Sequence, residues 1–317
     1  MKTRLLTSLY IAIALVLAFA SRFFTLYVFD ALVGLFAVVG AVEIARVLER
    51  SKKFSSIILV GLYPAAMYVG LFIAFFYQLS WWYYLLFFVR VYLLFFVASF
   101  VLTLLNKKET NRIITKYELK QPKWRFALDC AFNTGFVGIY PSLMFMTLIL
   151  LNHFAQLPNV TNLLPNNANL LATFFLLLAV VVTVCCDSLA MITGMIFKGP
   201  KLAPIISPKK TISGAIGGLV GGTLSGMLLF YFFSLNGAFL NAFARIGNNW
   251  TVFFISLLAS VLCQAGDLFA SYLKRRARVK DYGTIFPGHG GVMDRYDGLV
   301  FTSTFVSISV LVLLVLV

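Results

Sequence analysis

The sequence predicts an all-α, polytopic integral membrane protein with about nine transmembrane helices. Three observations lead to this prediction. The 317 residues are 61% hydrophobic and 12% charged, with a mean hydropathy of +0.93, whereas a soluble domain is roughly half apolar and a quarter charged. Long apolar runs recur along the chain, and basic residues gather in every second loop between them. Such a surplus of apolar side chains needs lipid, as well as a protein core, to cover it.

Each apolar run is long enough to cross a bilayer as a helix, which takes about 20 residues. Continuous runs favour helices over the alternating segments of a barrel. The first run is interpreted as a retained span and not as a cleaved signal peptide, because a second apolar run follows it. In chain order, the expected spans are 5–21, 25–45, 55–77, 80–105, 127–151, 169–197, 212–235, 250–272 and 298–317.

We divide the chain into two regions according to where the chemistry lies. Residues 1–126 form an N-terminal transmembrane region of about four spans with a basic loop, and residues 127–317 form a C-terminal catalytic transmembrane region of about five spans. The loop at 106–125 has two interpretations: a short amphipathic helix on the membrane surface or a solvated cytoplasmic connector.

The distribution of charge predicts how the chain crosses the membrane. The net charge is +15, from 26 Lys+Arg against 11 Asp+Glu, and most of the basic residues lie at the N-terminus or in alternate loops. The positive-inside rule then predicts a cytoplasmic N-terminus and an external C-terminus. Topology and anionic lipid account for the basic residues, so no nucleic-acid partner is expected.

Charged residues inside apolar runs are costly in lipid and therefore mark functional positions. Asp187 and Asp267 lie within two of the expected spans, and Arg90 lies within a third. Arg90 is open to two interpretations, a structural ion pair or a contact to a lipid phosphate. The cysteines all lie in apolar segments without a CxxC pair, and they predict neither a disulfide framework nor a zinc site; they are Cys130, Cys185, Cys186 and Cys263.

Charged residues and glycines are concentrated in the segment that follows Asp267. On a helix, Asp267, Ser271 and Lys274 share one face. A cationic run at 274–280 and a glycine-rich turn at 287–291 come next, and glycine lets the backbone approach a ligand closely.

Asp294 and Asp297 then stand three residues apart, on one helix face if the last span begins there. Packed against Asp267, they are expected to form a carboxylate cluster at the cytoplasmic interface. Carboxylates beside cations suit a complex of Mg²⁺ with a polyphosphate, since Mg²⁺ takes oxygen ligands and Lys or Arg neutralises the remaining charge. The alternative is a juxtamembrane basic segment with incidental counter-ions.

The segment 271–297 resembles the signature of phosphatidate cytidylyltransferases, with Ser271, Lys274-Arg275, Lys280-Asp281, the run Pro287-Gly-His-Gly-Gly291 and Asp294-Arg-Tyr-Asp297 in register. A second block is similar to the same family: Asp187 with small residues after it, then Ser207-Pro-Lys-Lys-Thr211. Ser213 stands where the family usually has Glu, and Met191 where Tyr is frequent. The resemblance covers about residues 180–300. A Glu at position 213 could bind metal or orient a lysine, and Ser213 has no carboxylate for either role.

The resemblance implies transfer of CMP from CTP to phosphatidic acid, with Mg²⁺ as cofactor and a second cation if the site is paired. The implied catalytic residues are Asp267, Lys274, Asp294 and Arg295. The implied metal ligands are Asp267, Asp294 and Asp297, with Asp187 and Asp281 as further candidates. Implied substrate and phosphate contacts are Ser207, Lys209, Lys210, Thr211, Ser271, Arg275, Lys280, Gly288, His289, Gly290 and Gly291.

The expected setting is the cytoplasmic side of a cell membrane, a bacterial inner membrane by the chain's length, with a homodimer as a candidate assembly by family analogy. Two other functions remain open. A CTP-dependent lipid kinase of the dolichol kinase type would transfer a phosphoryl group to an alcohol, and a catalytically degenerate family member would transfer nothing. A transporter is disfavoured, since no internal repeat or broken span is evident.

Overall fold

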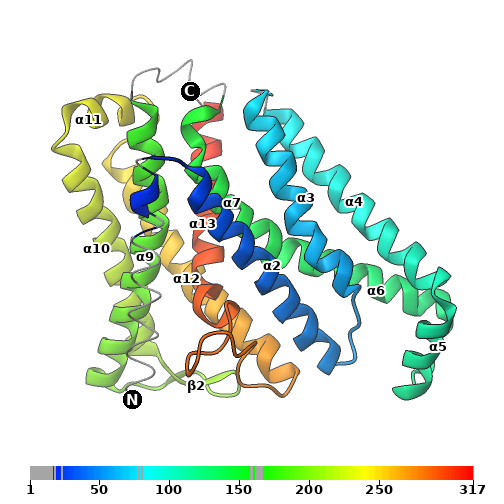
Figure 1. Ribbon diagram of the computed structural model, residues 1–317. Coiled ribbons are helices and arrows are strands. Elements are labelled where there is room, and N and C mark those ends of the chain that lie inside the picture. Colours follow the sequence, from blue (N-terminus) through cyan, green and yellow to red (C-terminus); the bar gives the residue numbers. More distant parts are fainter. Residues whose placement is uncertain are drawn as a thin grey trace. The chain divides into compact units, whose positions relative to one another are not determined.

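The computed structural model describes residues 17–316 except 18, 23, 78, 80, 158, 159 and 161–166. These residues confirm an all-α polytopic membrane protein (Figure 1). Eight of their helical segments are long and apolar enough to cross a membrane. They correspond to eight of the expected spans, whereas most of the expected span 5–21 lies outside the described residues.

The membrane-crossing helices follow the apolar runs of the sequence. Each begins and ends near the polar residues that bound a run, because backbone groups in lipid must be satisfied within the helix. The helices are α2 (Tyr27–Arg50), α3 (Ile57–Phe76), α4 (Trp81–Leu105), α6 (Lys123–Val137), α9 (Ala168–Phe197), α10 (Ile212–Ser234), α12 (Asn249–Arg276) and α13 (Met293–Leu316).

The span that begins with α6 continues through η1 (Gly138–Leu143) into α7 (Met144–Asn152). The interruption follows from Pro141, which lacks an N–H and cannot continue the regular helical ladder. Ser142 compensates in part, since its hydroxyl donates to the carbonyl of Val137 at 2.9 Å. Shorter helices are α5 (Lys107–Lys116), η2 (Phe154–Gln156) and α11 (Gly237–Phe243).

The segment 106–125, left open by the sequence, contains the helix α5. Asn106 caps it by accepting a hydrogen bond from the N–H of Glu109 at 3.3 Å. Four of its ten residues are basic. Ile113 and Ile114 pack against a small core around Phe54. Part of the segment is therefore helical, whereas its position on the membrane surface stays a prediction.

A two-stranded antiparallel hairpin is the only sheet among the described residues. Strand β1 (Lys201–Ala203) pairs with β2 (Ser207–Thr211), with Lys201 opposite Thr211 and Ala203 opposite Ser207. The sequence analysis expected only a loop here. The hairpin leads directly into α10, so it places the lysines of β2 at the start of a membrane helix.

The chain folds into two compact units. The first comprises residues 1–146 and 273–294, and the second comprises 147–272 and 295–317. These units differ from the regions 1–126 and 127–317, which were defined by where the motifs lie; that division stays a prediction. Because the units are discontinuous, the last turn of α12 and the first residues of α13 belong to the first unit.

In the first unit, α2 packs against α3, α6 and η1, and α4 packs against α6 (Figure 1). The inner face of α2 presents apolar residues at intervals of three or four, namely Val33, Ala37, Ala41, Ile44 and Leu48. Two buried residues on this helix break the apolar pattern, Asp30 and Glu43. Glu43 lies toward the end of α2, and its residue surface is 4% exposed.

In the second unit, α9 packs along α10, and α11 closes their far end. The aromatic ring of Phe174 on α9 lies 5–6 Å from the rings of Phe230, Phe239 and Phe243. The opposite end of α9 and α10 meets the β1–β2 hairpin. This packing fixes the hairpin against the end of α9, the helix that carries Asp187.

Candidate active site

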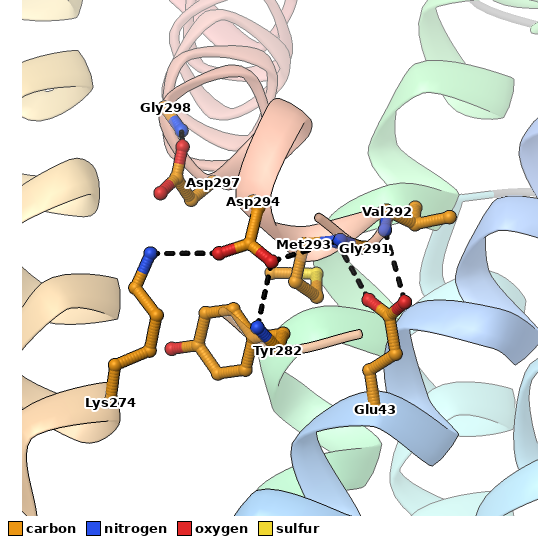
Figure 2. Close-up of polar contacts among 9 residues, drawn as sticks. All are labelled: Glu43, Lys274, Tyr282, Gly291, Val292, Met293, Asp294, Asp297 and Gly298. Carbon is orange, nitrogen blue, oxygen red and sulfur yellow. Dashed lines mark hydrogen bonds and ion pairs between the residues drawn. The ribbon is translucent and has the colours of Figure 1, made fainter. Parts of the chain in front are cut away.

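The signature segment of the first unit is organised around Asp294. Its side chain is 5% exposed, and its Oδ1 lies 2.8 Å from the Nζ of Lys274, whose side chain is 14% exposed. The other oxygen, Oδ2, accepts hydrogen bonds from the backbone N–H groups of Tyr282, at 2.7 Å, and Gly291, at 2.9 Å. Figure 2 shows the carboxylate between the lysine on one side and these two amides on the other. One aspartate thus joins three parts of the signature.

The glycine-rich turn is held mainly by bonds within the turn. Gly288 and Gly290 adopt φ values of 77° and 89°, in the region that favours glycine. The N–H groups of His289 and Gly290 both donate to the carbonyl of Phe286, at 2.8 and 3.1 Å, while that of Gly291 donates to Asp294. The amides of residues 289–291 are therefore engaged internally in this structure. Their expected role in holding phosphate stays a prediction and requires some of these bonds to open.

Glu43 of α2 also contacts the signature segment, a role that the sequence analysis missed. Its Oε1 accepts from the N–H of Val292 at 3.1 Å, and its Oε2 accepts from that of Met293 at 2.9 Å (Figure 2). The available signal was a carboxylate inside an apolar run, the criterion that selected Asp187 and Asp267. Its partners lie about 250 residues away, and no local pattern connects them.

In the second unit, Lys210 of the block at 207–211 pairs with Asp267 of α12. The Nζ of Lys210 lies 2.6 Å from the Oδ2 of Asp267, and both side chains are partly exposed. Lys209 is exposed. It points to the opposite face from Lys210, because successive side chains of a strand alternate. The strand thus separates two adjacent lysines that the sequence analysis treated as equivalent.

Thr211 and Ser213 close the junction between β2 and α10. The hydroxyl of Thr211 caps α10 by accepting from the N–H of Gly214 at 3.1 Å. Ser213, which stands where the resembled family usually has Glu, donates to the Thr211 hydroxyl and accepts from the N–H of Gly199 at 3.3 Å. Both hydroxyls therefore have structural partners, whatever contact Thr211 makes with a substrate.

Helices α12 and α13 approach closely in the second unit beside Asp267. A Cβ on Gly266 would lie 2.9 Å from the carbonyl oxygen of Asp297 and 2.5 Å from the ring of Phe301. Asp297 uses one carboxylate oxygen to accept from the N–H of Gly298 at 2.9 Å. The glycine allows the contact, because any side chain there would force the helices apart. The expected cluster of Asp267, Asp294 and Asp297 stays a prediction.

Asp187 lies beside two cysteines in the second unit. The Sγ of Cys263 donates to its Oδ1 at 3.6 Å, and the ligand atoms of Asp187, Cys186 and Cys263 lie within 4.8 Å of one another. The sequence spacing did not predict this group. Three donors are one fewer than the four protein ligands of a structural zinc site. Asp187 stays a further candidate for metal binding.

The remaining predicted residues divide by exposure. Ser207 and Ser271 are half-buried, and His289 is half-buried within the glycine turn. The side chains that reach solvent or lipid are Arg90, Arg275, Lys280, Asp281 and Arg295. Their expected roles at the site stay predictions.

The side chains present fit a hard divalent cation. Its preferred ligands are oxygens, and both Asp267 and Asp294 offer carboxylate oxygens that already contact a positive charge, the ammonium of Lys210 or of Lys274. Each ammonium stands where a cation would be attracted.

These features define a polytopic helical membrane protein with two lysine–carboxylate pairs at the ends of its membrane helices. The chain belongs to the Cytidylyltransferase family, whose sequence pattern matches residues 2–313.

Curated relatives of the chain carry the name phosphatidate cytidylyltransferase. The chain is 43% identical over 121 residues to that of Rickettsia felis and 42% identical over 117 residues to that of Rickettsia prowazekii, in each case 37% of this chain and 50% of the relative. It is 42% identical over 114 residues to that of Brucella suis, 36% of this chain and 38% of the relative. The matches thus span half, or less, of the length of these relatives.

Proposed function

We propose that this protein transfers CMP from CTP to phosphatidic acid and forms CDP-diacylglycerol and pyrophosphate, a step of phospholipid biosynthesis. One observation carries the proposal. The segment 271–297, which matches the cytidylyltransferase signature, is folded around the buried contact between Lys274 and Asp294. The names of the curated relatives support the same activity.

The reaction balances as a single displacement. A phosphate oxygen of phosphatidic acid attacks the α-phosphorus of CTP, a new P–O–P bond forms, and the bond between the α-phosphorus and the β-phosphate oxygen breaks. Pyrophosphate carries away the electron pair of that bond. A phosphomonoester is already largely ionised near pH 7, so the attack needs no strong general base.

Bringing two anions together is the main physical difficulty, so positioning and charge neutralisation supply most of the rate. In our proposal, Lys210 and Lys274 turn from their carboxylates to substrate phosphates. Arg275, Lys280 and Arg295 are exposed and add further positive charge. The carboxylates of Asp267 and Asp294 would then hold Mg²⁺, with Asp297 as a third ligand. Bound there, Mg²⁺ would supply Lewis-acid stabilisation of the charge on the phosphates.

The setting that we propose is the cytoplasmic face of a bacterial inner membrane. Soluble CTP and a lipid headgroup can meet only at such an interface. The hairpin lysines and the run at 274–280 lie in loops that the positive-inside rule places in the cytoplasm. The acyl chains of phosphatidic acid would remain between or beside the helices.

The test uses full-length protein purified in mixed micelles of detergent and lipid. CTP labelled with ³²P at the α-phosphate, phosphatidic acid and Mg²⁺ are added, and chloroform-extractable label is followed. We expect a labelled CDP-lipid that EDTA abolishes. Asp294→Asn should reduce its formation at least about 100-fold, since a group that contacts reacting charges is removed. Asp129→Asn, an equivalent change at an exposed position of α6, should leave the rate unchanged.

The result that overturns the proposal is the absence of labelled lipid from folded protein. CTP labelled at the γ-phosphate, offered with diacylglycerol or a polyprenol, then distinguishes the alternatives. Label in the lipid would identify a CTP-dependent lipid kinase. No transfer from either position would identify a degenerate member, for which Ser213 in place of Glu is the specific sequence feature.

A further inference from the structure

The carboxylate of Glu43 is buried within α2, yet both of its oxygens accept hydrogen bonds from a distant segment. The donors are the N–H groups of Val292 and Met293, at 3.1 and 2.9 Å. The bonds join α2 to the start of α13 within the first unit. A buried carboxylate is costly unless it is satisfied, and here two main-chain amides satisfy it.

The start of α13 lacks a cap of its own. Met293 is the first residue of the helix, and the first amides of a helix have no partner within it. Ser, Thr, Asp or Asn at the preceding position usually supplies an acceptor. That position is Val292, whose side chain carries none. Glu43 supplies the missing acceptor, and its negative charge is favourable at a helix N-terminus.

Two glycines of the signature leave room for this carboxylate. A Cβ on Gly291 would lie 2.2 Å from the Oε1 of Glu43, and a Cβ on Gly283 would lie 2.3 Å from the same oxygen. Both distances are far shorter than any non-bonded contact. Glycine at these two positions therefore leaves space for the Glu43 carboxylate, whether or not a ligand also approaches them.

The contacts of Glu43 and Asp294 alternate along the same stretch of chain. Gly291 donates to Asp294, Val292 and Met293 donate to Glu43, and Asp294 follows directly. Figure 2 shows the two carboxylates accepting hydrogen bonds from successive amides of this stretch. Moving Val292 and Met293 would consequently move Asp294 relative to Lys274.

We propose that Glu43 is a positioning residue of the active site. It holds the first turn of α13 so that the carboxylate of Asp294 is presented in the geometry needed to bind the cation. It does not touch the substrate. The inference rests on the proposed function for its effect on catalysis, but its effect on the backbone of residues 291–293 can be measured without any activity.

The first experiment measures hydrogen exchange of the peptide covering residues 286–296 in wild-type and Glu43→Gln protein. The glutamine has the same shape but can accept through one atom only, so one of the two amides loses its acceptor. We expect slow exchange at Val292 and Met293 in the wild type and faster exchange in the variant. Glu49→Gln, six positions along α2 and half-buried, is the matched control and should change neither amide.

The second experiment measures CDP-lipid formation by the same proteins, per folded molecule. We expect kcat to fall about tenfold in Glu43→Gln and about 100-fold in Glu43→Ala, since small misplacement of a reacting group costs this much. The Mg²⁺ concentration for half-maximal rate should rise, while KM for phosphatidic acid stays unchanged. A purely structural role would lower the folded fraction without changing either kinetic value.

The outcomes separate the two proposals. Fast exchange of Val292 and Met293 in the wild type overturns the role of Glu43 whether or not any variant folds. Wild-type kcat and Mg²⁺ dependence in folded Glu43→Gln would overturn it too. If wild-type protein forms no CDP-lipid, the proposed function fails, and slow exchange at these amides then leaves Glu43 as a helix cap without a catalytic consequence.

Discussion

At the scale of single residues, the two lysine–carboxylate pairs look equivalent in sequence but differ in burial. The Lys274–Asp294 pair is almost enclosed, with side chains 14% and 5% exposed, whereas those of Lys210 and Asp267 are 26% and 32% exposed. Removing one member of a buried pair leaves a charge without compensation. At a partly exposed pair, solvent screens the charge that remains. The two lysines should therefore contribute unequally to stability.

We predict that Lys274→Met lowers the free energy of unfolding by about 3 kcal/mol, and that Lys210→Met lowers it by about 1 kcal/mol or less. Equilibrium unfolding in mixed detergent micelles measures both values, with tryptophan fluorescence as the probe. The hydrocarbon part of the lysine side chain is retained in each variant, so the comparison isolates the charge. Equal losses in the two variants would contradict the interpretation from burial.

At the residue scale, sequence reasoning selected the residues of both lysine–carboxylate pairs and missed Glu43. Asp267, Asp294 and Lys274 were selected by type and spacing, and Lys210 by the family resemblance. The structure pairs each carboxylate with a lysine. Glu43 was detectable as a charge in an apolar run. Its contact with Val292 and Met293 was not, because no periodicity relates positions about 250 residues apart.

At the scale of elements, the approach of α10 to α12 depends on small residues. A Cβ on Gly222 would lie 2.2 Å from the Oγ of Ser260, and one on Gly226 would lie 2.1 Å from the Oγ of Ser256. In lipid, such close packing replaces the hydrophobic effect as the force between helices. Because β2 leads into α10 and Asp267 lies on α12, this packing also determines the distance from Lys210 to Asp267.

We predict that Gly222→Ala lowers the free energy of unfolding by about 1–3 kcal/mol through overpacking and reduces activity by separating Lys210 from Asp267. Gly61→Ala is the matched control, since it lies within α3 with nothing within 4 Å of the added carbon. It should be neutral or stabilising by up to about 1 kcal/mol, because alanine favours helix. Thermal unfolding in detergent and the CDP-lipid assay check both. Tolerance of Gly222→Ala in both measurements would show that the helices adjust.

Sequence reasoning predicted the helices well and the connections less well. The apolar runs located eight spans and the short segment α5 was one of two stated interpretations. The β1–β2 hairpin was not expected. Its strands are only three and five residues long, and their pairing depends on α9 and α10 bringing their ends together, which local composition does not report.

At the scale of the whole molecule, the basic loops carry the information on orientation. They alternate with loops that are nearly uncharged, as the positive-inside rule predicts when basic loops lie on the cytoplasmic side. The helices described by the structure are consistent with this alternation. Helices alone do not show which of their ends faces the cytoplasm. The cytoplasmic N-terminus therefore stays a prediction, and the proposed access of CTP depends on it.

We predict that single cysteines introduced as Lys52→Cys and Lys116→Cys react with a membrane-impermeant maleimide only after bacterial cells are permeabilised. Asn236→Cys, in the turn between α10 and α11, should react in intact cells. The native cysteines lie in membrane helices and are buried or half-buried, so their background is small. The reverse labelling pattern would invert the topology and place the lysine–carboxylate pairs on the side without CTP.

The sequence by itself determined that this chain is a helical membrane protein, where most of its helices run, and which residues resemble a cytidylyltransferase site. These properties are local, because hydropathy and charge act on each segment within about 20 residues. The tertiary structure alone decided which lysine meets which carboxylate, that the amides of the glycine turn are engaged by its own residues, and that Glu43 holds the start of α13. Hydrogen bonds act over about 3 Å, so only folding could bring these distant partners within reach.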